Sequence, residues 1–384
     1  MDLRCLMDGR RTGVEEYTLG ILREMIRASP SDTFVLFANS RKPMRLPSFD
    51  APNVELRTFR YPNKLFNLSL KLVHAPRLDA LVGGVDVFFV PSIRLAPVRM
   101  PCPLVLTVHD LSFVRHPEFF SWGRRLWHTF MEPRRLAQRA DAVIAVSLAT
   151  ADDVAALYAV PASRISVIPS GIPMAYAPGS AALDAQDCRR RYQLPEQFLL
   201  YLGTLEPRKN LDALLGAYTR VRTAGLPHAL VLAGVRGWVD KGFFTRIRQH
   251  PYRDDIILTG FVDDADKPMV YQLADLFVYP SFYEGFGFPP LEALASGTPV
   301  VTSFNSAIPE IVGRWATLVN PYDPEEIAMV VVDRLRHPAR VPEHISAEIR
   351  TRYTWERAAQ ETLRVLRTVA NVSKDRSLPF YVKQ

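Results

Sequence analysis

Short runs of apolar residues alternate with amphipathic stretches along most of this 384-residue chain. Such alternation predicts parallel β-sheets whose strands are connected by helices, a doubly wound α/β fold. We expect the strands in two series, one in each half of the chain. The first comprises 33–38, 54–59, 86–91, 104–109, 142–147 and 165–169; the second comprises 198–203, 229–234, 256–261, 275–280, 299–302 and 317–319.

Two series of strands indicate two domains, and the length of the chain supports the same division. The stretch 173–195 is rich in Pro, Gly and Ala, and it predicts a linker with a short helix. We therefore expect one Rossmann-like domain over 1–172 and a second over 196–350. Ligands of such folds collect at the carboxyl ends of the strands, in a crevice.

The composition narrows the class of protein. Apolar residues make up 48% of the chain and charged residues 23%, as in ordinary globular proteins, and no apolar run approaches the length of a membrane span. The cysteines (Cys5, Cys102 and Cys188) are few and scattered, which favours reduced thiols in a cytosol. Neither Cys-x-x-Cys nor His-x-x-x-His spacing occurs, so we predict no metal site.

The segment 279–302 carries the most chemical information. An apolar strand is followed by a loop with Glu284, Gly285 and Gly287, and then by a helix that opens at Pro289-Pro290 and carries Glu292. The glycines permit close approach of the backbone to a ligand, and the helix start offers free N–H groups to an anion. Carboxylates repel phosphate, so both acids are better placed on sugar hydroxyls. A helix start with acids of no function is the plainer alternative.

Other candidates lie at further strand ends. Arg208 and Lys209 precede a helix for which Asn210 is a plausible N-cap, and two cations there suit a diphosphate. His109 and Asp110 end a buried strand; a packed histidine and a metal-binding pair are the alternatives to a ligand contact. Gly13 opens the helix 14–28, but its loop is not the Gly-x-Gly-x-x-Gly of nicotinamide-binding proteins.

The sequence Glu-Gly-Phe-Gly-Phe-Pro-Pro-Leu-Glu-Ala, with Glu284 and Glu292 at its acidic positions, resembles the signature of family 4 retaining glycosyltransferases of the GT-B fold. The resemblance implies that Glu292 holds the ribose of a nucleotide-sugar donor and that Glu284 lies by the donor hexose. It implies that Lys209 binds the donor phosphate and that His109 meets the transferred sugar. Arg208 substitutes for an arginine that many relatives carry directly after the glycine, where this chain has Thr204. The remaining donor contacts it implies are Gly13, Val262, Gly285, Phe286, Gly287, Phe288 and Leu291.

The resemblance also implies an activity: transfer of a hexose, with retention and without a metal, to a saccharide or lipid-linked saccharide. The loop around Lys209 and the glutamate motif look most like bacterial mannosyltransferases that build surface polysaccharide. GDP-mannose is therefore the first donor expected and a UDP-sugar the second, at the cytoplasmic face of the membrane. A GT-B-shaped nucleotide-sugar epimerase and a basic nucleic-acid-binding protein are the alternatives.

Landmarks of the same family have structural roles in our reading. Ser147 and the turn at Ser170-Gly171 are expected to be scaffold, and Asp263, Asp264 and Asp266 to cap the helix that follows them. Thr354 is expected to cap a C-terminal helix over 354–370 that completes the N-terminal domain.

Met1 stands where relatives have nearly finished a central strand, so we expect an upstream start or a destabilised chain. Equal thermal stability of an upstream-extended version would contradict this expectation.

Basic charge exceeds acidic charge by 7, which favours an anionic partner. Two segments concentrate it among aromatic and leucine residues: 56–78, which has no acid, and 115–139, which has six arginines. One interpretation is a surface that binds anionic lipid headgroups. The other is helices with solvated basic faces and buried aromatic faces.

Overall fold

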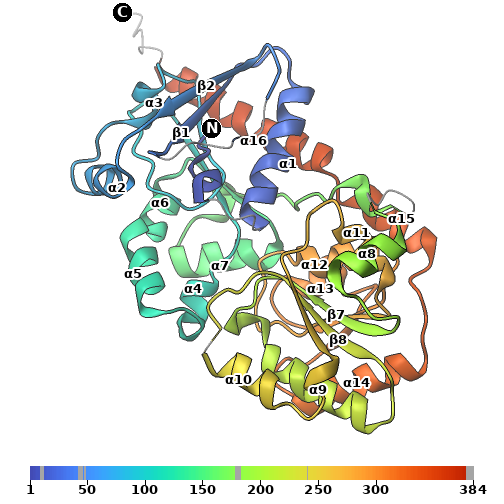
Figure 1. The fold of residues 1–384 in the computed structure, drawn as a ribbon. Coiled ribbons are helices and arrows are strands. Elements are labelled where there is room, and N and C mark those ends of the chain that lie inside the picture. Colours follow the sequence, from blue (N-terminus) through green and yellow to red (C-terminus); the bar gives the residue numbers. More distant parts are fainter. Residues whose placement is uncertain (9–12, 42–45, 47–48, 178–182, 240, 378–384) are drawn as a thin grey trace, which may run out of the picture. The chain divides into compact units, whose positions relative to one another are not determined.

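The computed structural model describes the chain except residues 9–12, 42–45, 47–48, 178–182, 240 and 378–384 (Figure 1). The chain divides into two compact units, which are described separately. The first comprises residues 1–115, 122–171 and 354–384, and the second comprises residues 116–121 and 172–353. None of the helices over the described residues is long and apolar enough to cross a membrane.

Parallel strands form the core of the first unit. A sheet in the order β3-β4-β5-β6 lies beside a pair of strands, β1 and β2. The strands are β1 Phe34–Asn39, β2 Val54–Phe59, β3 Phe88–Val90, β4 Leu104–Val108, β5 Ala142–Ala145 and β6 Ile165–Val167. The helices are α1 Gly13–Ala28, α2 Asn63–Leu72, α3 Leu78–Leu81, α4 Ser112–Arg115, α5 Trp122–Met131, α6 Pro133–Arg139, α7 Leu148–Tyr158 and α16 Trp355–Ser377.

The first residues of the chain connect the two sets of strands. The amide of Asp2 donates to Phe89 of β3 at 2.9 Å, and the amide of Leu3 donates to Phe37 of β1 at 2.7 Å. Asp2 is itself buried and paired with Arg4 at 2.6 Å. This short run therefore lies between β1 and β3 and satisfies backbone groups on both sides.

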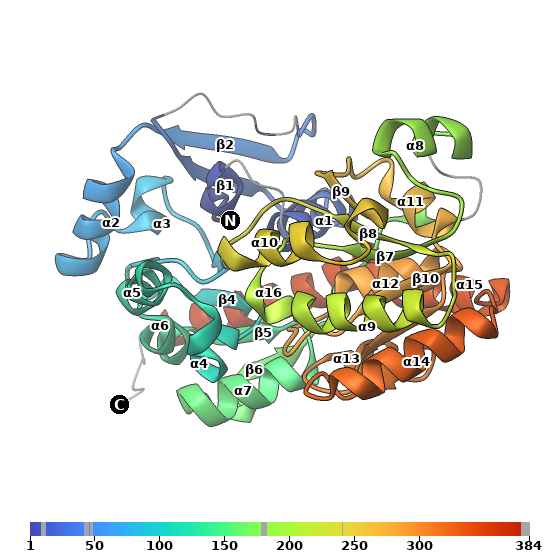
Figure 2. The same cartoon turned by 60° about the horizontal axis from the view of Figure 1, so that its bottom comes forward.

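The second unit is a single six-stranded parallel sheet in the order β12-β11-β10-β7-β8-β9. Its strands are β7 Phe198–Leu202, β8 Ala229–Ala233, β9 Ile256–Gly260, β10 Leu276–Tyr279, β11 Val300–Ser303 and β12 Thr317–Val319. Its helices are α8 Ala185–Tyr192, α9 Leu211–Thr223, α10 Lys241–Gln249, α11 Lys267–Leu273, α12 Phe288–Ala295, α13 Ile308–Val312, α14 Pro324–Arg336 and α15 Glu343–Arg352. Helices α9 and α14 pack side by side (Figure 2).

Every strand expected from the sequence is present, and the parallel α/β class is confirmed. Most strands end one or two residues earlier than expected. At His109, Gly203 and Pro280 the chain has already left the sheet, since residues that follow the carboxyl end of a strand turn into loops.

Two of the helix N-caps expected from the sequence, those of α9 and α11, are wrong. Asn210 precedes α9 in the left-handed region with φ of 56°, and its side chain donates to Pro321 O at 2.7 Å instead of capping the helix. Asp266 makes no capping bond to α11; it accepts from Arg191 and from the Tyr192 hydroxyl. Both side chains have stronger partners from distant parts of the second unit. Ser147 and Thr354, by contrast, each accept a hydrogen bond from the first turn that follows.

Helices α1 and α16 pack against each other in the first unit (Figure 1). The ring centroids of Tyr17 and Trp355 lie 5.9 Å apart, and Arg367 pairs with Asp32 at 2.9 Å. The expected C-terminal helix is therefore present, and its start is held against Gly171. A Cβ atom at Gly171 would lie 2.1 Å from the Trp355 nitrogen.

This contact makes Gly171→Ala a test of packing at the start of α16. The new methyl group meets backbone, which cannot rotate away, so we expect a loss of about 1–3 kcal/mol in the free energy of unfolding. Gly123→Ala is the matched control, because a Cβ there has no neighbour within 4 Å. Thermal unfolding of both variants measures the difference, and equal melting temperatures would contradict the expectation.

Candidate active site

The loop after β7 carries three charged residues close together. Arg208 and Lys209 lie in a single turn of 3-10 helix over Pro207–Lys209, which Glu206 directly precedes, and α9 begins at Leu211. Proline begins this turn, where its missing N–H costs no hydrogen bond. The turn is held from the neighbouring strand end, because the amide of Phe282 donates to Arg208 O at 2.9 Å.

The loop after β10 carries Glu284 and then enters α12. The amide of Glu284 donates to the Ser306 hydroxyl at 2.8 Å, and its carbonyl accepts from the amide of Ala307. Gly287 precedes the helix with φ of 95°, a conformation that side chains other than glycine rarely adopt. A Cβ there would also lie 2.6 Å from Ile308 Cδ1, so the loop requires glycine at this position.

These two loops bring opposite charges into direct contact. Lys209 Nζ lies 2.6 Å from one carboxylate oxygen of Glu284, and an Arg208 nitrogen lies 3.0 Å from the other. Arg208 also binds Glu206 at 2.8 Å, while Lys209 is 3.9 Å from the same acid. All four side chains are at most 13% exposed. We call this group, Glu206, Arg208, Lys209 and Glu284, the charge cluster.

The electrostatics of the charge cluster favour the ionised form of Glu284. Burial alone would raise the pKa of Glu284, but the charges of Arg208 and Lys209 outweigh it and lower that pKa to about 2. Burial and the neighbouring Arg208 lower the pKa of Lys209 from its usual value, and the two acids oppose that shift. The lysine also donates to the Tyr279 hydroxyl at 2.5 Å. Arg208 and Lys209 therefore lie in a buried setting, where the interaction of a charged group with an added anion is strong.

Glu292 lies further along α12 and has a different environment. It is 2% exposed, and it accepts a hydrogen bond of 2.8 Å from the Tyr271 hydroxyl of α11. Carboxylate oxygens have more than one acceptor position, so the Tyr271 bond leaves capacity for a further hydroxyl donor. Val262, which we expected near a nucleotide base, lies just after β9. Its side chain is buried, so a contact with a base would be made by its backbone.

In the first unit, His109 directly follows β4. Its Nε2 lies 2.8 Å from the carbonyl oxygen of Pro91, so this nitrogen carries the hydrogen. The ring meets Tyr17 edge to face at 4.7 Å. Burial lowers the pKa of His109, which keeps the ring neutral at pH 7 with a lone pair on Nδ1. Asp110 accepts from both the amide and the hydroxyl of Ser112, a local role that does not favour a metal-binding pair with His109.

Within the second unit, the structure brings Arg208, Lys209 and Glu284 into contact and places Glu292 on the helix that follows Glu284. The backbone of Gly285, Phe286, Gly287 and Phe288 lies between the two acids, and the Leu291 side chain is fully buried. His109 and Gly13 belong to the first unit. Gly13 is the first residue of α1, and residues 9–12 of its loop lie outside the described part of the chain.

Our reading of the sequence missed two members of this site. Glu206 stands only two residues before Arg208, and an acid so close to paired cations was the available signal. Tyr279 ends β10, and its hydroxyl reaches Lys209 only because β7 and β10 are neighbours in the sheet.

Comparison with known proteins identifies the class to which this fold, with its charged and glycine-bearing loops at the strand ends of the second unit, belongs. Residues 11–176 match the family model for Glycosyltransferase Family 4, and residues 186–351 match that for Glycosyl transferases group 1. The chain is 30% identical over 346 residues to O-antigen chain mannosyltransferase B of Escherichia coli, covering 85% of this chain and 87% of that protein. The chain belongs to family 4 of the retaining glycosyltransferases and is a hexosyltransferase.

Solved structures support the GT-B fold. Sucrose-phosphate synthase from Thermosynechococcus elongatus superposes with a TM-score of 0.73 at 22% identity, over 94% of each chain. The HepE protein of Anabaena in complex with UDP-glucose gives a TM-score of 0.67 at 20% identity, over 94% of this chain and 97% of that one. The expected GT-B fold is confirmed.

Proposed function

We propose that this glycosyltransferase transfers mannose from GDP-mannose to a saccharide or lipid-linked saccharide, in the assembly of a surface polysaccharide at the cytoplasmic face of the membrane. The observation that carries the proposal is the 30% identity to an O-antigen chain mannosyltransferase over 85% of the chain. A UDP-sugar is the second candidate donor, because a protein of the same fold was solved with UDP-glucose.

The charge cluster supports a role in departure of the nucleoside diphosphate. When the acceptor hydroxyl attacks the anomeric carbon, the bond from that carbon to the phosphate oxygen breaks and negative charge grows on the diphosphate. Lys209 and Arg208 are positioned to stabilise that charge, and the proton of the acceptor hydroxyl goes to a phosphate oxygen. Since each cation already contacts a carboxylate, the donor must share or replace those contacts. Glu206 keeps Arg208 oriented while this happens.

The acids and the histidine have complementary roles in this proposal. Glu284, released in part from Lys209, accepts hydrogen bonds from hydroxyls of the donor hexose. Glu292 accepts from the ribose hydroxyls and keeps its bond from Tyr271. His109 contacts the transferred sugar through its neutral ring, as the family resemblance implies. The glycines around Phe286 let the backbone approach the sugar and the diphosphate.

Thermal unfolding with candidate ligands tests the donor. We expect GDP and GDP-mannose to raise the melting temperature more than UDP and UDP-glucose at equal concentration, since ligands that bind the native state stabilise it. Release of GDP from GDP-mannose, measured with and without saccharide acceptors, tests the reaction. A larger shift with UDP-glucose and turnover of that donor would overturn the choice of GDP-mannose.

The ribose assignment predicts a defect in binding. Glu292→Gln has nearly the same shape but loses a charged acceptor, and we expect the donor Kd to rise about 10-fold to 100-fold. Tyr271→Phe is the matched control: it removes the hydroxyl that donates to Glu292 and keeps the carboxylate, so its effect is smaller. Calorimetric titration with the preferred nucleotide measures both, and an unchanged Kd for Glu292→Gln would remove the assignment.

A further inference from the structure

Helix α8 ends in two residues, Arg191 and Tyr192, that contact the loop leading into α11. The helix lies in the stretch 173–195, which the sequence predicts to be a linker, and it belongs to the second unit. Helices α8 and α11 pack against each other (Figure 1). A helix of the linker is therefore attached to α11, which carries the hydrogen-bond partner of Glu292.

The polar contacts between the two helices centre on Asp266, the residue directly before α11, which is 2% exposed. Its carboxylate accepts a hydrogen bond of 2.6 Å from the Tyr192 hydroxyl and one of 2.9 Å from Arg191. Arg191 also pairs with Asp263 of the same loop. A buried carboxylate needs partners of this kind, so the network attaches the start of α11 to the end of α8.

The Tyr192 hydroxyl also holds a peptide group of the loop. It accepts a hydrogen bond of 3.2 Å from the amide of Asp263, while its own hydrogen goes to Asp266. That amide belongs to the planar peptide bond between Val262 and Asp263, so the hydroxyl also fixes the direction of the Val262 carbonyl group. Burial raises the pKa of Tyr192 to about 12, so the hydroxyl keeps its hydrogen at neutral pH.

A second contact from the linker reaches α11 beside the acid that we assign to the ribose. Tyr271, further along α11, donates from its hydroxyl to the Glu292 carboxylate at 2.8 Å. The ring centroid of Tyr271 lies 6.1 Å from that of Tyr176, which ends a turn of 3-10 helix before α8. The linker therefore contacts both the loop at the start of α11 and the tyrosine that binds Glu292.

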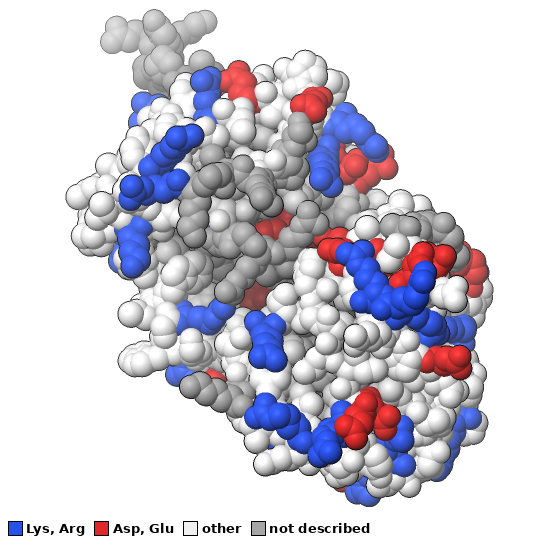
Figure 3. Space-filling view, in the orientation of Figure 1, with Lys and Arg blue, Asp and Glu red and all other residues white. Residues whose placement is uncertain are grey.

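Arg191 differs from its neighbour Arg190 in the partner that it binds. Arg190 pairs with Asp187 within α8, and its side chain is 74% exposed. In Figure 3 blue and red atoms lie side by side over α8. Exposed pairs contribute little to stability. Because Asp266 is buried, its pair with Arg191 is the one expected to fix the loop.

We infer that Arg191 and Tyr192 are positioning residues for the nucleoside half of the donor. They hold the loop 262–266, which we expect to meet the base, and they hold α11, whose Tyr271 orients Glu292 toward the ribose. The inference rests on the proposed function, which assigns the ribose to Glu292. Since the nucleoside is bound alike before and during departure of the diphosphate, loss of this support weakens donor binding and leaves the rate of the bound donor unchanged.

Calorimetric titration of the full chain tests the inference, with GDP or UDP, whichever gives the larger thermal shift. Tyr192→Phe keeps the ring and removes the hydroxyl that accepts from the Asp263 amide, and we expect the Kd to rise about 5-fold to 10-fold. Arg191→Gln is expected to have an effect of similar size. Single-turnover rates with saturating donor should stay within about 2-fold of the unaltered chain in both variants, as expected when uniform binding is lost.

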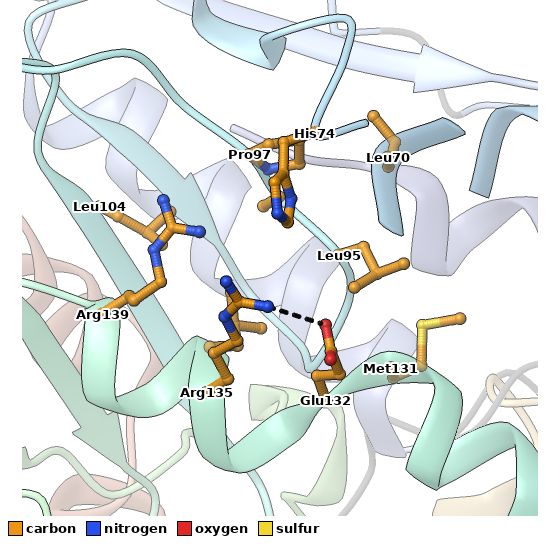
Figure 4. Close-up of a pocket in the computed structure, with 11 residues that line it drawn as sticks. Leu70, His74, Leu95, Pro97, Leu104, Met131, Glu132, Arg135 and Arg139 are labelled. Atoms are coloured by element: carbon orange, nitrogen blue, oxygen red, sulfur yellow. Dashed lines mark ion pairs between the residues drawn. The ribbon is translucent and has the colours of Figure 1, made fainter. Parts of the chain in front are cut away.

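Two arginine variants serve as controls. Arg190→Gln changes the exposed neighbour on the same helix. Arg135→Gln changes a pair of the first unit, in which an Arg135 nitrogen lies 3.9 Å from a Glu132 oxygen beside a shallow groove (Figure 4). Both should bind the nucleotide as the unaltered chain does. A loss of folded protein alone would lower the binding stoichiometry and the melting temperature without changing the Kd, so a raised Kd separates positioning from stability.

An unchanged Kd in both Tyr192→Phe and Arg191→Gln, while the unaltered chain binds the nucleotide, would overturn this inference alone. So would a single-turnover rate that falls about 10²-fold in these variants, because the two residues would then act on the departing diphosphate. Absence of a thermal shift with GDP and with UDP in the unaltered chain would instead overturn the proposed function, and this inference with it.

Discussion

Lys209→Met is expected to lower turnover by about 10²-fold to 10³-fold, the range found when one group that stabilises developing charge is removed. In the proposed reaction, negative charge on the diphosphate increases as the bond to the anomeric carbon breaks, so the lysine contributes more to the transition state than to donor binding. Methionine has a similar volume and keeps the buried site filled. Single-turnover rates with saturating donor measure this effect separately from affinity.

Two controls show whether a lower rate in Lys209→Met comes from loss of the ammonium group itself. Tyr279→Phe removes the hydroxyl that accepts from Lys209 and leaves the ammonium in place, so its effect on the rate should be several times smaller. The melting temperature of Lys209→Met shows whether the fold persists, since Glu284 still has Arg208 as a partner. If the donor Kd rises and the single-turnover rate is unchanged, the lysine binds the donor but does not assist departure of the diphosphate.

Glu284→Ala is expected to affect stability as well as activity. It leaves Lys209 and Arg208 buried with Glu206 as their remaining partner in the charge cluster, and breaking a buried pair in this way costs about 3–5 kcal/mol. The matched control is Glu325→Ala, which removes the partner of Arg220 in a pair more than half exposed and should cost less than about 1 kcal/mol. Denaturant unfolding measures both. Equal costs would show that the charge cluster is well solvated.

The pKa of Glu284 gives this prediction a dependence on pH. The folded state holds the pKa at about 2, below the ordinary value of 4.5, so folding favours the ionised form. The resulting stabilisation is fully present above pH 4.5 and is lost as pH falls toward 2. The difference in unfolding free energy between the unaltered chain and Glu284→Gln should therefore shrink over this interval. A difference that stays constant from pH 6 to pH 3 would contradict a lowered pKa.

Local sequence was sufficient for the order of strands and helices and for the residue types of the site. Apolar runs of strand length rarely form anything but buried strands in a chain of this kind. Gly287 and Pro289 indicate a loop and a helix start through their own conformational preferences, whatever their tertiary contacts. The glutamate motif and the Arg208-Lys209 pair lie within short segments. Their chemistry could be read before any contact was known.

The partners of these residues depended on the tertiary structure. Asn210 and Asp266 both have the chemistry of helix caps, but Pro321 and Arg191 compete for them from far along the chain. The contact of Glu284 with Lys209 arises because β7 and β10 are adjacent in the sheet, although 75 residues separate the two side chains. Propensity acts over a few residues, whereas these bonds form between segments that only the sheet order brings together.

The amino-acid sequence by itself determined the α/β class, the family and the acids and cations available for the donor. The tertiary structure decided which of those charges meet, that Glu206 and Tyr279 join them, and that the end of α8 holds the start of α11. The physical reason is that burial and the pairing of charges depend on neighbours in space, and strand order sets those neighbours.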